Sequence, residues 1–394
     1  MKKLSGVLII AILSFLLAAF TPAQEADWEK INSEAEQLQL QGKYEEAKIK
    51  SKEAVQEAEK IFGQSHPNVA ISMSNLALVY FSQARYSDAA FYYDKASRII
   101  EKAYGPEDPR FAIALNNLGE VYRERGKYNK AEPLYSQALA IMEKKYGISH
   151  PDVERSLYNL AALYKAQAKY VEAENLYLRA ITALEKEVPG DDPRVAALLN
   201  NLAVVYYYKK EYKNAEENYS QALAILEKQY GPQHPKVASP LNNLALAYHA
   251  QGKYTEAEPL YVQALKIMEK TLGPEHPKIA TSLNNLANVY IKLNKFDNAE
   301  QLYKRAIEIH KKAFGDYHHE IAKDMNNLAH LYQLEGKYFE AEQFYVRALD
   351  ICEKTVGPAH PDYETILGNL QNLRKIMKRA QQQEEIQTED EQNE

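Results

Sequence analysis

The amino-acid sequence predicts an all-α protein, in which eight helix-turn-helix repeats stack into a right-handed superhelix (an α-solenoid) and a C-terminal helix caps the stack. A tripeptide recurs every 42 residues without insertion or deletion, which indicates a repeat architecture. Apolar residues within each repeat follow the i, i+3, i+4 spacing of an amphipathic helix. Only 15 Gly and 16 Pro occur in 394 residues, which favours helices. Each repeat would bury its apolar face only against its neighbours.

The recurring tripeptide is Asn-Asn-Leu, as in Asn116-Asn117-Leu118. Its later copies begin at Asn200, Asn242, Asn284 and Asn326, and related tripeptides begin at Ser74, Tyr158 and Gly368. One further step back reaches a degenerate first copy around Asn32. The period therefore gives eight repeats over about 32–367, which we assign to a solenoid domain of residues 24–367.

Each repeat is predicted to contain a first helix (helix A) and a second helix (helix B). In the third repeat we expect helix A over about 110–124 and helix B over about 129–145, joined by a turn at Gly126. Gly suits the left-handed conformation with which many helices end. The turn is helped by Gly but does not require it, because other repeats place a different residue there: Ala84, Ala168, Lys210 and Asn294.

The loop between repeats carries the motif Gly-x-x-His-Pro, as in Gly147 to Pro151. Pro fits the first helical position, and the residue before it is held out of the helical conformation and so fits the N-cap. Asp, a good N-cap, replaces His in two repeats. We therefore predict that one column of residues starts the A helices: His66, Asp108, His150, Asp192, His234, His276, His318 and His360.

The first 23 residues have the pattern of a secretory signal peptide. Lys2 and Lys3 precede an apolar stretch over 4–20, and the small residues Thr21-Pro22-Ala23 follow. The alternative is an uncleaved membrane anchor, but the stretch is shorter than the roughly 20 residues that span a bilayer. We expect cleavage near Ala23, so that the mature protein is periplasmic or secreted and contacts no membrane after export.

Negative charge is concentrated at the C-terminal end. The net charge is −6, and the last fourteen residues carry six acids. We predict a capping helix over 368–380 and an acidic, disordered tail over 381–394. Without the tail and the leader, 46 basic and 48 acidic side chains remain. A body so close to neutral argues against nucleic-acid binding through a basic face.

The sequence shows no pattern for catalysis or for a cofactor. It has neither a Gly-rich phosphate loop nor a Gly-x-Ser-x-Gly motif. Six of the ten His occupy one loop position, one per repeat, so they are not expected to converge on a metal. The single Cys352 is expected to be a buried, unreactive thiol. We therefore predict a protein that is not an enzyme and binds no cofactor or metal.

The repeat resembles the tetratricopeptide repeat family at seven positions of the third copy: Leu118, Gly119, Tyr122, Tyr128, Ala131, Tyr135 and Ala138. The 42-residue form, with Asn-Asn-Leu-Ala, Gly-Lys-Tyr-x-x-Ala-Glu-x-Leu-Tyr and Gly-x-x-His-Pro, is similar to the repeats of kinesin light chains. The resemblance implies a solenoid that binds other proteins. Kinesin light chains begin with a motor-binding coiled coil where this chain has its leader, so the resemblance does not extend to a motor role.

Three Tyr columns at the 42-residue period account for 21 of the 30 Tyr. They begin at Tyr80, at Tyr93 and at Tyr44. These rings could stack on a ligand, but period-locked aromatic residues on an apolar face are expected to form the core between repeats. We therefore assign them to the core.

The second Asn of the tripeptide is the most informative column. Asn is a mediocre helix former, so its recurrence in the middle of helix A needs a reason. Either each Asn bonds a neighbouring helix and stiffens the stack, or the amides line the concave groove and pair with the backbone of an extended peptide. The two interpretations are compatible, and the resemblance supports the second. The column comprises Asn75, Asn117, Asn159, Asn201, Asn243, Asn285, Asn327 and Asn369.

Further helix A residues are expected to face the same groove if the family geometry holds: Glu120, Arg123, Lys165, Tyr207, Tyr208, His249, Lys292, Lys323 and His330. Most of them are basic or aromatic, so the ligand is predicted to carry acidic and apolar side chains. The predicted function is a scaffold that binds an unidentified protein or peptide in the groove. The alternative is a structural component of a cell-envelope assembly that uses the convex face or the ends of the solenoid.

Overall fold

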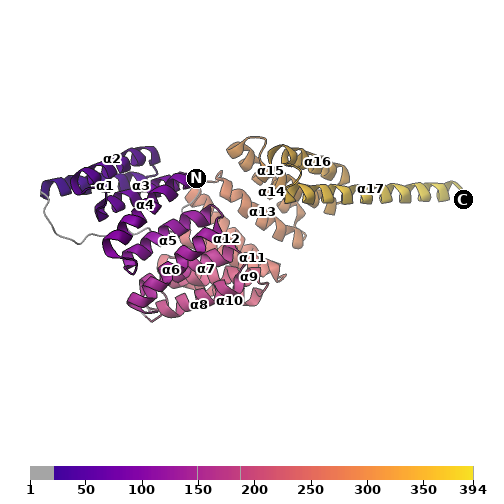
Figure 1. The fold of residues 1–394 in the computed structure, drawn as a ribbon. Helices are drawn as coiled ribbons and strands as arrows, with labels where there is room; N and C mark the ends of the chain where they lie inside the picture. Colours follow the sequence, from indigo (N-terminus) through magenta and orange to yellow (C-terminus); the bar gives the residue numbers. More distant parts are fainter. Residues whose placement is uncertain (1–21, 149, 187, 394) are drawn as a thin grey trace. The chain divides into compact units, whose positions relative to one another are not determined.

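The structure, a computed structural model, describes residues 22–148, 150–186 and 188–393. Within these ranges all regular structure is helical, which confirms the all-α solenoid class (Figure 1). The chain forms two compact units, residues 1–205 and 206–394. The predicted signal peptide lies outside the described residues, except for Pro22 and Ala23 at the start of the first helix. None of the described helices is long and apolar enough to cross a membrane.

The helices follow one another in the predicted pairs, and each pair corresponds to one repeat. Unit 1 contains α1 (Pro22–Leu40), α2 (Tyr44–Phe62), α3 (Pro67–Ser82), α4 (Tyr86–Tyr104), α5 (Pro109–Glu124), α6 (Tyr128–Tyr146), α7 (Pro151–Ala166), α8 (Tyr170–Leu184) and most of α9 (Pro193–Tyr208). Unit 2 contains the end of α9, α10 (Tyr212–Tyr230), a 3-10 turn (Pro235–Val237), α11 (Ala238–Ala250), α12 (Tyr254–Leu272), α13 (Pro277–Lys292), α14 (Phe296–Phe314), α15 (His319–Leu334), α16 (Tyr338–Thr355) and α17 (Pro361–Asn393).

The predicted column of N-caps starts the A helices. In α3, His66 Nδ1 accepts a hydrogen bond from the backbone N–H of Asn68 at 3.2 Å, and Pro67 occupies the first helical position. Asp108 makes the equivalent bond to the N–H of Arg110 at 2.9 Å. The side chain thus satisfies one of the N–H groups that a helix start leaves unpaired. His and Asp can replace each other at the N-cap because both side chains offer a hydrogen-bond acceptor to the backbone N–H two residues later.

The turn between helices A and B requires a left-handed residue in every repeat. Gly126 has φ of +68°, and Lys210 has φ of +63° in its place. A side chain at such a φ costs energy, yet the turn keeps the same backbone. The prediction that Gly favours this turn without being required is confirmed.

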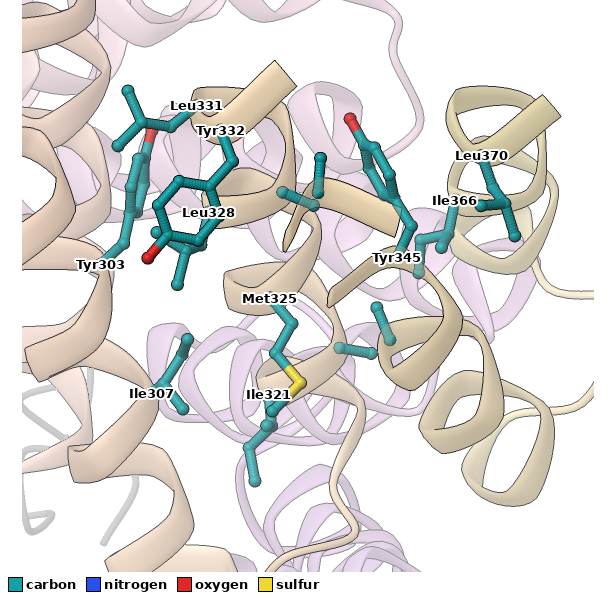
Figure 2. Close-up of a cluster of buried hydrophobic side chains, with 14 of the residues drawn as sticks. Tyr303, Ile307, Ile321, Met325, Leu328, Leu331, Tyr332, Tyr345, Ile366 and Leu370 are labelled. Atoms are coloured by element: carbon teal, nitrogen blue, oxygen red, sulfur yellow. The ribbon is translucent and has the colours of Figure 1, made fainter. Parts of the chain in front are cut away.

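The Tyr93 column forms the centre of the core in both units. Its seven rings are at most 2% exposed: Tyr93, Tyr135, Tyr177, Tyr219, Tyr261, Tyr303 and Tyr345. Figure 2 shows the end of this core in unit 2, where Ile366 and Leu370 of α17 close the cluster around Tyr345. The prediction of a Tyr core is confirmed for this column. Rings of the other two columns are mostly half-buried, because the turn lies beside them.

Half-buried Tyr residues link each repeat to the one before it. In unit 1 the Tyr164 hydroxyl donates to Glu132 at 3.1 Å, while Lys169 of the turn lies over the Tyr164 ring and 3.3 Å from the same carboxylate. In unit 2 Lys253 lies over the Tyr248 ring and bonds Glu216 at 2.7 Å. The cation gains from the ring face and from the carboxylate together. We call these contacts the Tyr-Lys-Glu links.

Two core Tyr residues should respond differently to loss of their hydroxyl. Tyr135 donates to Glu120 Oε2 at 2.8 Å, whereas the buried Tyr177 hydroxyl has no hydrogen-bond partner among the described residues. We expect Tyr135→Phe to lower the free energy of unfolding by about 1.5–3 kcal/mol, as for hydrogen bonds to charged groups, and Tyr177→Phe to be neutral or stabilising. Urea unfolding compares the two variants. Equal losses would contradict this account.

The last helix is longer than predicted. We expected a capping helix over 368–380 and disorder over 381–394, but α17 runs from Pro361 to Asn393. Ile366, Leu370 and Leu373 bury its first half against α15 and α16. The second half is rich in Gln, Glu, Lys and Arg, which are good helix formers, and contains neither Gly nor Pro. Composition that suits a solvated tail therefore also suits a solvated helix.

Candidate functional site

The two Asn residues of the repeated tripeptide have different environments. The first lies between repeats: Asn116 is 4% exposed, and its Nδ2 donates to Ser156 Oγ at 3.2 Å. In unit 2 Asn284 Nδ2 donates to Asp324 Oδ1 at 2.6 Å in the same way. The first Asn therefore supplies the stiffening that we had considered for the second. A Ser or Asp 40 residues further on is the sequence signal that could have found it.

The second Asn residues are mostly half-buried on the A helices. Asn117 and Asn159 in unit 1, and Asn285 and Asn327 in unit 2, make no side-chain hydrogen bond within the described residues. A half-buried amide has lost part of its hydration, so it retains one acceptor and two donors that a ligand can use. These four amides are therefore available to a ligand.

The other members of this column contact the protein itself. Asn75 is 9% exposed and its Nδ2 donates to Glu36 Oε1 at 3.0 Å. Asn201 accepts a hydrogen bond from Lys165 Nζ at 2.9 Å. Asn369 donates to Asn326 at 2.9 Å. Asn243 is half-buried and also takes part in an interaction. Members of this column therefore differ between repeats in whether their side chains bond within the protein.

Arg123 is neutralised by its own repeat. Its Nε donates to Glu120 Oε2 at 2.9 Å, and its second carboxylate partner, Glu124, lies at 2.8 Å. Burial acts to lower the pKa of Arg123, but the Glu120 carboxylate outweighs it and raises the pKa. Glu120 is only 8% exposed, and its carboxylate accepts hydrogen bonds from Arg123 and from the Tyr135 hydroxyl. Little of the carboxylate is therefore available to a ligand, and the prediction that Glu120 faces the groove stays untested.

Lys165 is a half-buried cation without a carboxylate partner among the described residues. Its hydrogen bond to Asn201 leaves the positive charge uncompensated. Burial, and secondarily the charge of Arg123, lower the pKa of Lys165 to about 8. A cation in this state gains strongly from an incoming anion. Unit 1 thus has an uncompensated positive charge beside Asn201.

Unit 2 carries a second basic and aromatic surface on successive A helices. Lys292 is exposed and has no carboxylate partner in the described part of the chain. Burial, followed by the nearby charge of Lys292, lowers the pKa of His249 and also that of His330. One Lys therefore influences two His residues on the A helices before and after its own. Tyr207 stacks at an angle on Tyr212, with ring centres 5.5 Å apart.

A buried acid–base pair was not predicted. His310 Nδ1 lies 2.6 Å from Asp324 Oδ2, and the two residues are 3% and 0% exposed. Because both are shielded from solvent, the pair belongs to the core and not to the candidate site. The described residues contain no cluster of three His, Cys, Asp or Glu side chains that could hold a metal. Cys352 is fully buried as predicted, and burial raises the pKa of its thiol.

Comparison with known proteins identifies the repeat. A family model described as tetratricopeptide repeat matches residues 31–109, 110–186, 194–270 and 236–312, and a second model with that description matches 325–362. A search among curated proteins found no match.

Several solved structures are similar to this chain. Two structures of the nearly identical TPR-like repeats of a Podosopora anserina putative kinesin light chain are 28–29% identical, with a TM-score of 0.47, and cover 52% of this chain and 97–98% of theirs. BtubC (BKLC) from P. vanneervenii is 24% identical, with a TM-score of 0.52, over 60% of this chain and 93% of that protein. The apo form of RapI is 14% identical, with a TM-score of 0.59, over 89% and 98%. The last two show likeness of fold.

Proposed function

Because this chain belongs to the tetratricopeptide repeat family and is a protein-interaction scaffold, we propose that it binds an extended segment of a partner protein on its A helices. The observation that carries the proposal is the column of half-buried Asn amides without intramolecular hydrogen bonds, at Asn117, Asn159, Asn285 and Asn327. An extended peptide presents N–H and C=O groups at regular intervals, and each amide can pair with both. The A helices are the surface that we expect to be concave.

The charges around these amides support an acidic ligand. Lys165 in unit 1 and Lys292 in unit 2 lack carboxylate partners among the described residues, whereas Arg123 is already neutralised. Ligand carboxylates would recover the charge compensation that Lys165 lacks in the half-buried environment. Aromatic residues such as Tyr207 would contact the apolar side chains. We therefore place acidic and apolar residues in the ligand.

Replacing the four free amides tests the binding mode. We expect Asn117→Ala, Asn159→Ala, Asn285→Ala and Asn327→Ala together to abolish capture of a partner that the wild-type protein retains, since each hydrogen bond contributes about 0.5–1.5 kcal/mol. The matched control is Asn175→Ala with Asn298→Ala, two exposed Asn residues on B helices. Affinity capture followed by mass spectrometry identifies the partner, and circular dichroism shows that both variants are folded.

The same experiment separates the two functions that we consider. A partner lost from the four-residue variant and kept by the control places binding on the A helices. A partner kept equally by both variants contradicts the proposal. Binding would then use the B helices or the ends, as expected for a structural component of an envelope assembly.

Binding of the captured acidic segment should weaken at alkaline pH. The pKa of Lys165 is about 8, so its ammonium group is charged at pH 7 and largely neutral at pH 9. If the charged form binds, affinity falls about tenfold between these pH values. Lys165→Arg keeps the charge and should remove this pH dependence, which fluorescence anisotropy with a labelled peptide would measure. An unchanged pH profile in Lys165→Arg contradicts a role for the Lys165 charge.

We also propose that the protein is exported, so that its partner is periplasmic or extracellular. The support is the sequence pattern of residues 1–23, with its basic start, apolar stretch and small residues. Mass spectrometry of the mature amino terminus tests this directly. A terminus near Gln24 is expected, and an intact chain that stays in the cytoplasm would contradict export.

A further inference from the structure

Helix α17 continues beyond the core that holds its first half. Ile366, Leu370 and Leu373 are at most 3% exposed, and Met377 packs at the edge of the same cluster. From Lys378 to Gln383 the side chains are exposed, apart from the half-buried Ala380. Figure 1 shows α17 running on past α15 and α16 of its own unit. Over Lys378 to Gln383, the last part of the helix whose side chains the structure describes, the helix therefore lies outside the core that holds its first half.

The charges along this extension oppose the stability of an isolated helix. Four basic residues lie over 374–379, and six acidic residues follow over 384–394. Neighbours at i+3 and i+4 in the basic segment are themselves basic, as Lys375 is to Lys378 and Arg379, and like charges at this spacing destabilise a helix. The last turn contains no basic residue, so acids lie at the negative end of the helix macrodipole.

Three of the basic residues lack compensation from the rest of the unit. Arg374 is paired with Glu342 of α16 at 2.6 Å. Lys375, Lys378 and Arg379 are exposed and have no carboxylate partner among the side chains that the structure describes. The exposed part of the helix thus carries a basic segment, and the sequence continues into an acidic one. A partner with the opposite order of charges would complement both segments.

We propose that the 374–393 segment of α17 is an interaction surface for a second copy of this chain, packed antiparallel. A register centred between Gln381 and Gln382 places Lys378 opposite Glu385 of the second copy and Arg379 opposite Glu384 of the second copy. Antiparallel packing also sets the two helix macrodipoles in the favourable sense. Ile376 and Ala380, which are half-buried in one chain, lie on this part of the helix and lose further contact with water.

The symmetry of the charge pattern favours a second copy over an unrelated partner. In a two-fold dimer every contact is made twice, because the same helix carries both the basic and the acidic half. Parallel packing would instead place like charges together. The segment is about 30 Å long, since each helical residue rises about 1.5 Å, so the interface is small and polar. Its association should therefore weaken as salt screens the charges.

Charge reversal tests the proposal with the purified protein. Sedimentation equilibrium at low and high salt should show dimers of the wild type that dissociate as salt rises. Lys378→Glu with Arg379→Glu should be monomeric, and so should Glu384→Lys with Glu385→Lys. An equimolar mixture of these two variants restores every opposite-charge contact and should form mixed dimers. Circular dichroism controls for folding, because the changes lie beyond the buried part of α17.

Three results would overturn the proposal. They are a wild-type protein that is monomeric at low salt, reversal variants that still dimerise, and a mixture that fails to restore the dimer. The first result would mean that a second copy of this chain does not bind the segment, and that any partner is a different molecule. The second would move self-association to another surface. The third would exclude the antiparallel register.

Discussion

Replacing Asp324 by Ala is expected to lower the free energy of unfolding of unit 2 by about 3–5 kcal/mol, the usual loss when one partner of a buried ion pair is removed. Asp324 is fully buried, bonds His310 at 2.6 Å and accepts from Asn284 at 2.6 Å. Burial alone would lower the pKa of His310, but the hydrogen bond and charge of Asp324 outweigh it and raise the pKa. The variant leaves a buried His and an unpaired Asn amide.

A neighbouring repeat supplies the matched control. Met268 and Ser282 occupy the positions of His310 and Asp324 one repeat earlier, and Ser282 Oγ donates to Met268 Sδ at 3.3 Å. The double variant His310→Met with Asp324→Ser copies this neutral pair and should unfold within about 1 kcal/mol of the wild type, because neutral replacement of a buried pair is often tolerated. A double variant as unstable as Asp324→Ala would show that lost packing, and not an unpaired charge, is responsible.

Hydrogen exchange is the suitable measurement, since a chain of two units need not unfold in one step. Protection of α13 to α16 reports unit 2 directly. The raised pKa of His310 also predicts the sign of a pH effect. The stabilisation that the pair provides is complete below about pH 6.5, the ordinary pKa of a His in an unfolded chain. It is lost as the pH rises through the higher pKa of His310 in the folded protein. The charges of Glu320 and His318 also interact with His310. The pH dependence of the double variant His310→Met with Asp324→Ser therefore serves as the baseline.

Truncating Tyr303 to Ala should cost about 3–5 kcal/mol, as for other large aromatic side chains in cores. Tyr303 is fully buried in the cluster of Figure 2, and its hydroxyl donates to Asn288 Oδ1 at 2.6 Å. The ring belongs to a cluster that joins α14 to residues of α13 and α15, so its loss leaves a cavity in the packing of these helices. We expect weaker protection of α13 to α16 from hydrogen exchange.

Tyr303→Phe separates the ring from its hydroxyl. This variant keeps the packing and loses one hydrogen bond, so it should cost only about 1 kcal/mol. If Phe and Ala cost the same, the hydroxyl and not the ring would dominate at this position. Comparison with Tyr177→Phe, which should cost nothing, completes the series.

The repeat period allowed most of the fold to be predicted. A strict 42-residue step identifies equivalent positions, so the His and Asp N-caps, the left-handed turn and the Tyr93 column all follow from a single repeat. Local chemistry determines these features, since a cap bonds an N–H two residues away. Residues that depend only on near neighbours are therefore predicted well.

The candidate site was predicted less completely because its residues depend on distant partners. Whether the second Asn bonds within the protein or stays available is decided by a residue of the preceding repeat, such as Glu36 for Asn75 or Lys165 for Asn201. Arg123 and Lys165 occupy equivalent positions, yet only Arg123 has a carboxylate one turn away at Glu120. The repeat period predicts the same role for every residue of a column. The residues around each member differ between repeats, so the members do not all have the same contacts. The peptide-binding assignments stay predictions until the variants are tested.

The Tyr-Lys-Glu links have a mechanical consequence. Each link reaches back by one repeat, as from Tyr164 and Lys169 to Glu132, so no link bridges two junctions at once. A chain pulled at its ends would then break one junction at a time, starting from the terminal pairs. We expect a force–extension trace with many small, evenly spaced steps, each releasing about 42 residues, instead of one large rupture. Such a solenoid would yield gradually under load and recoil repeat by repeat when the load is removed.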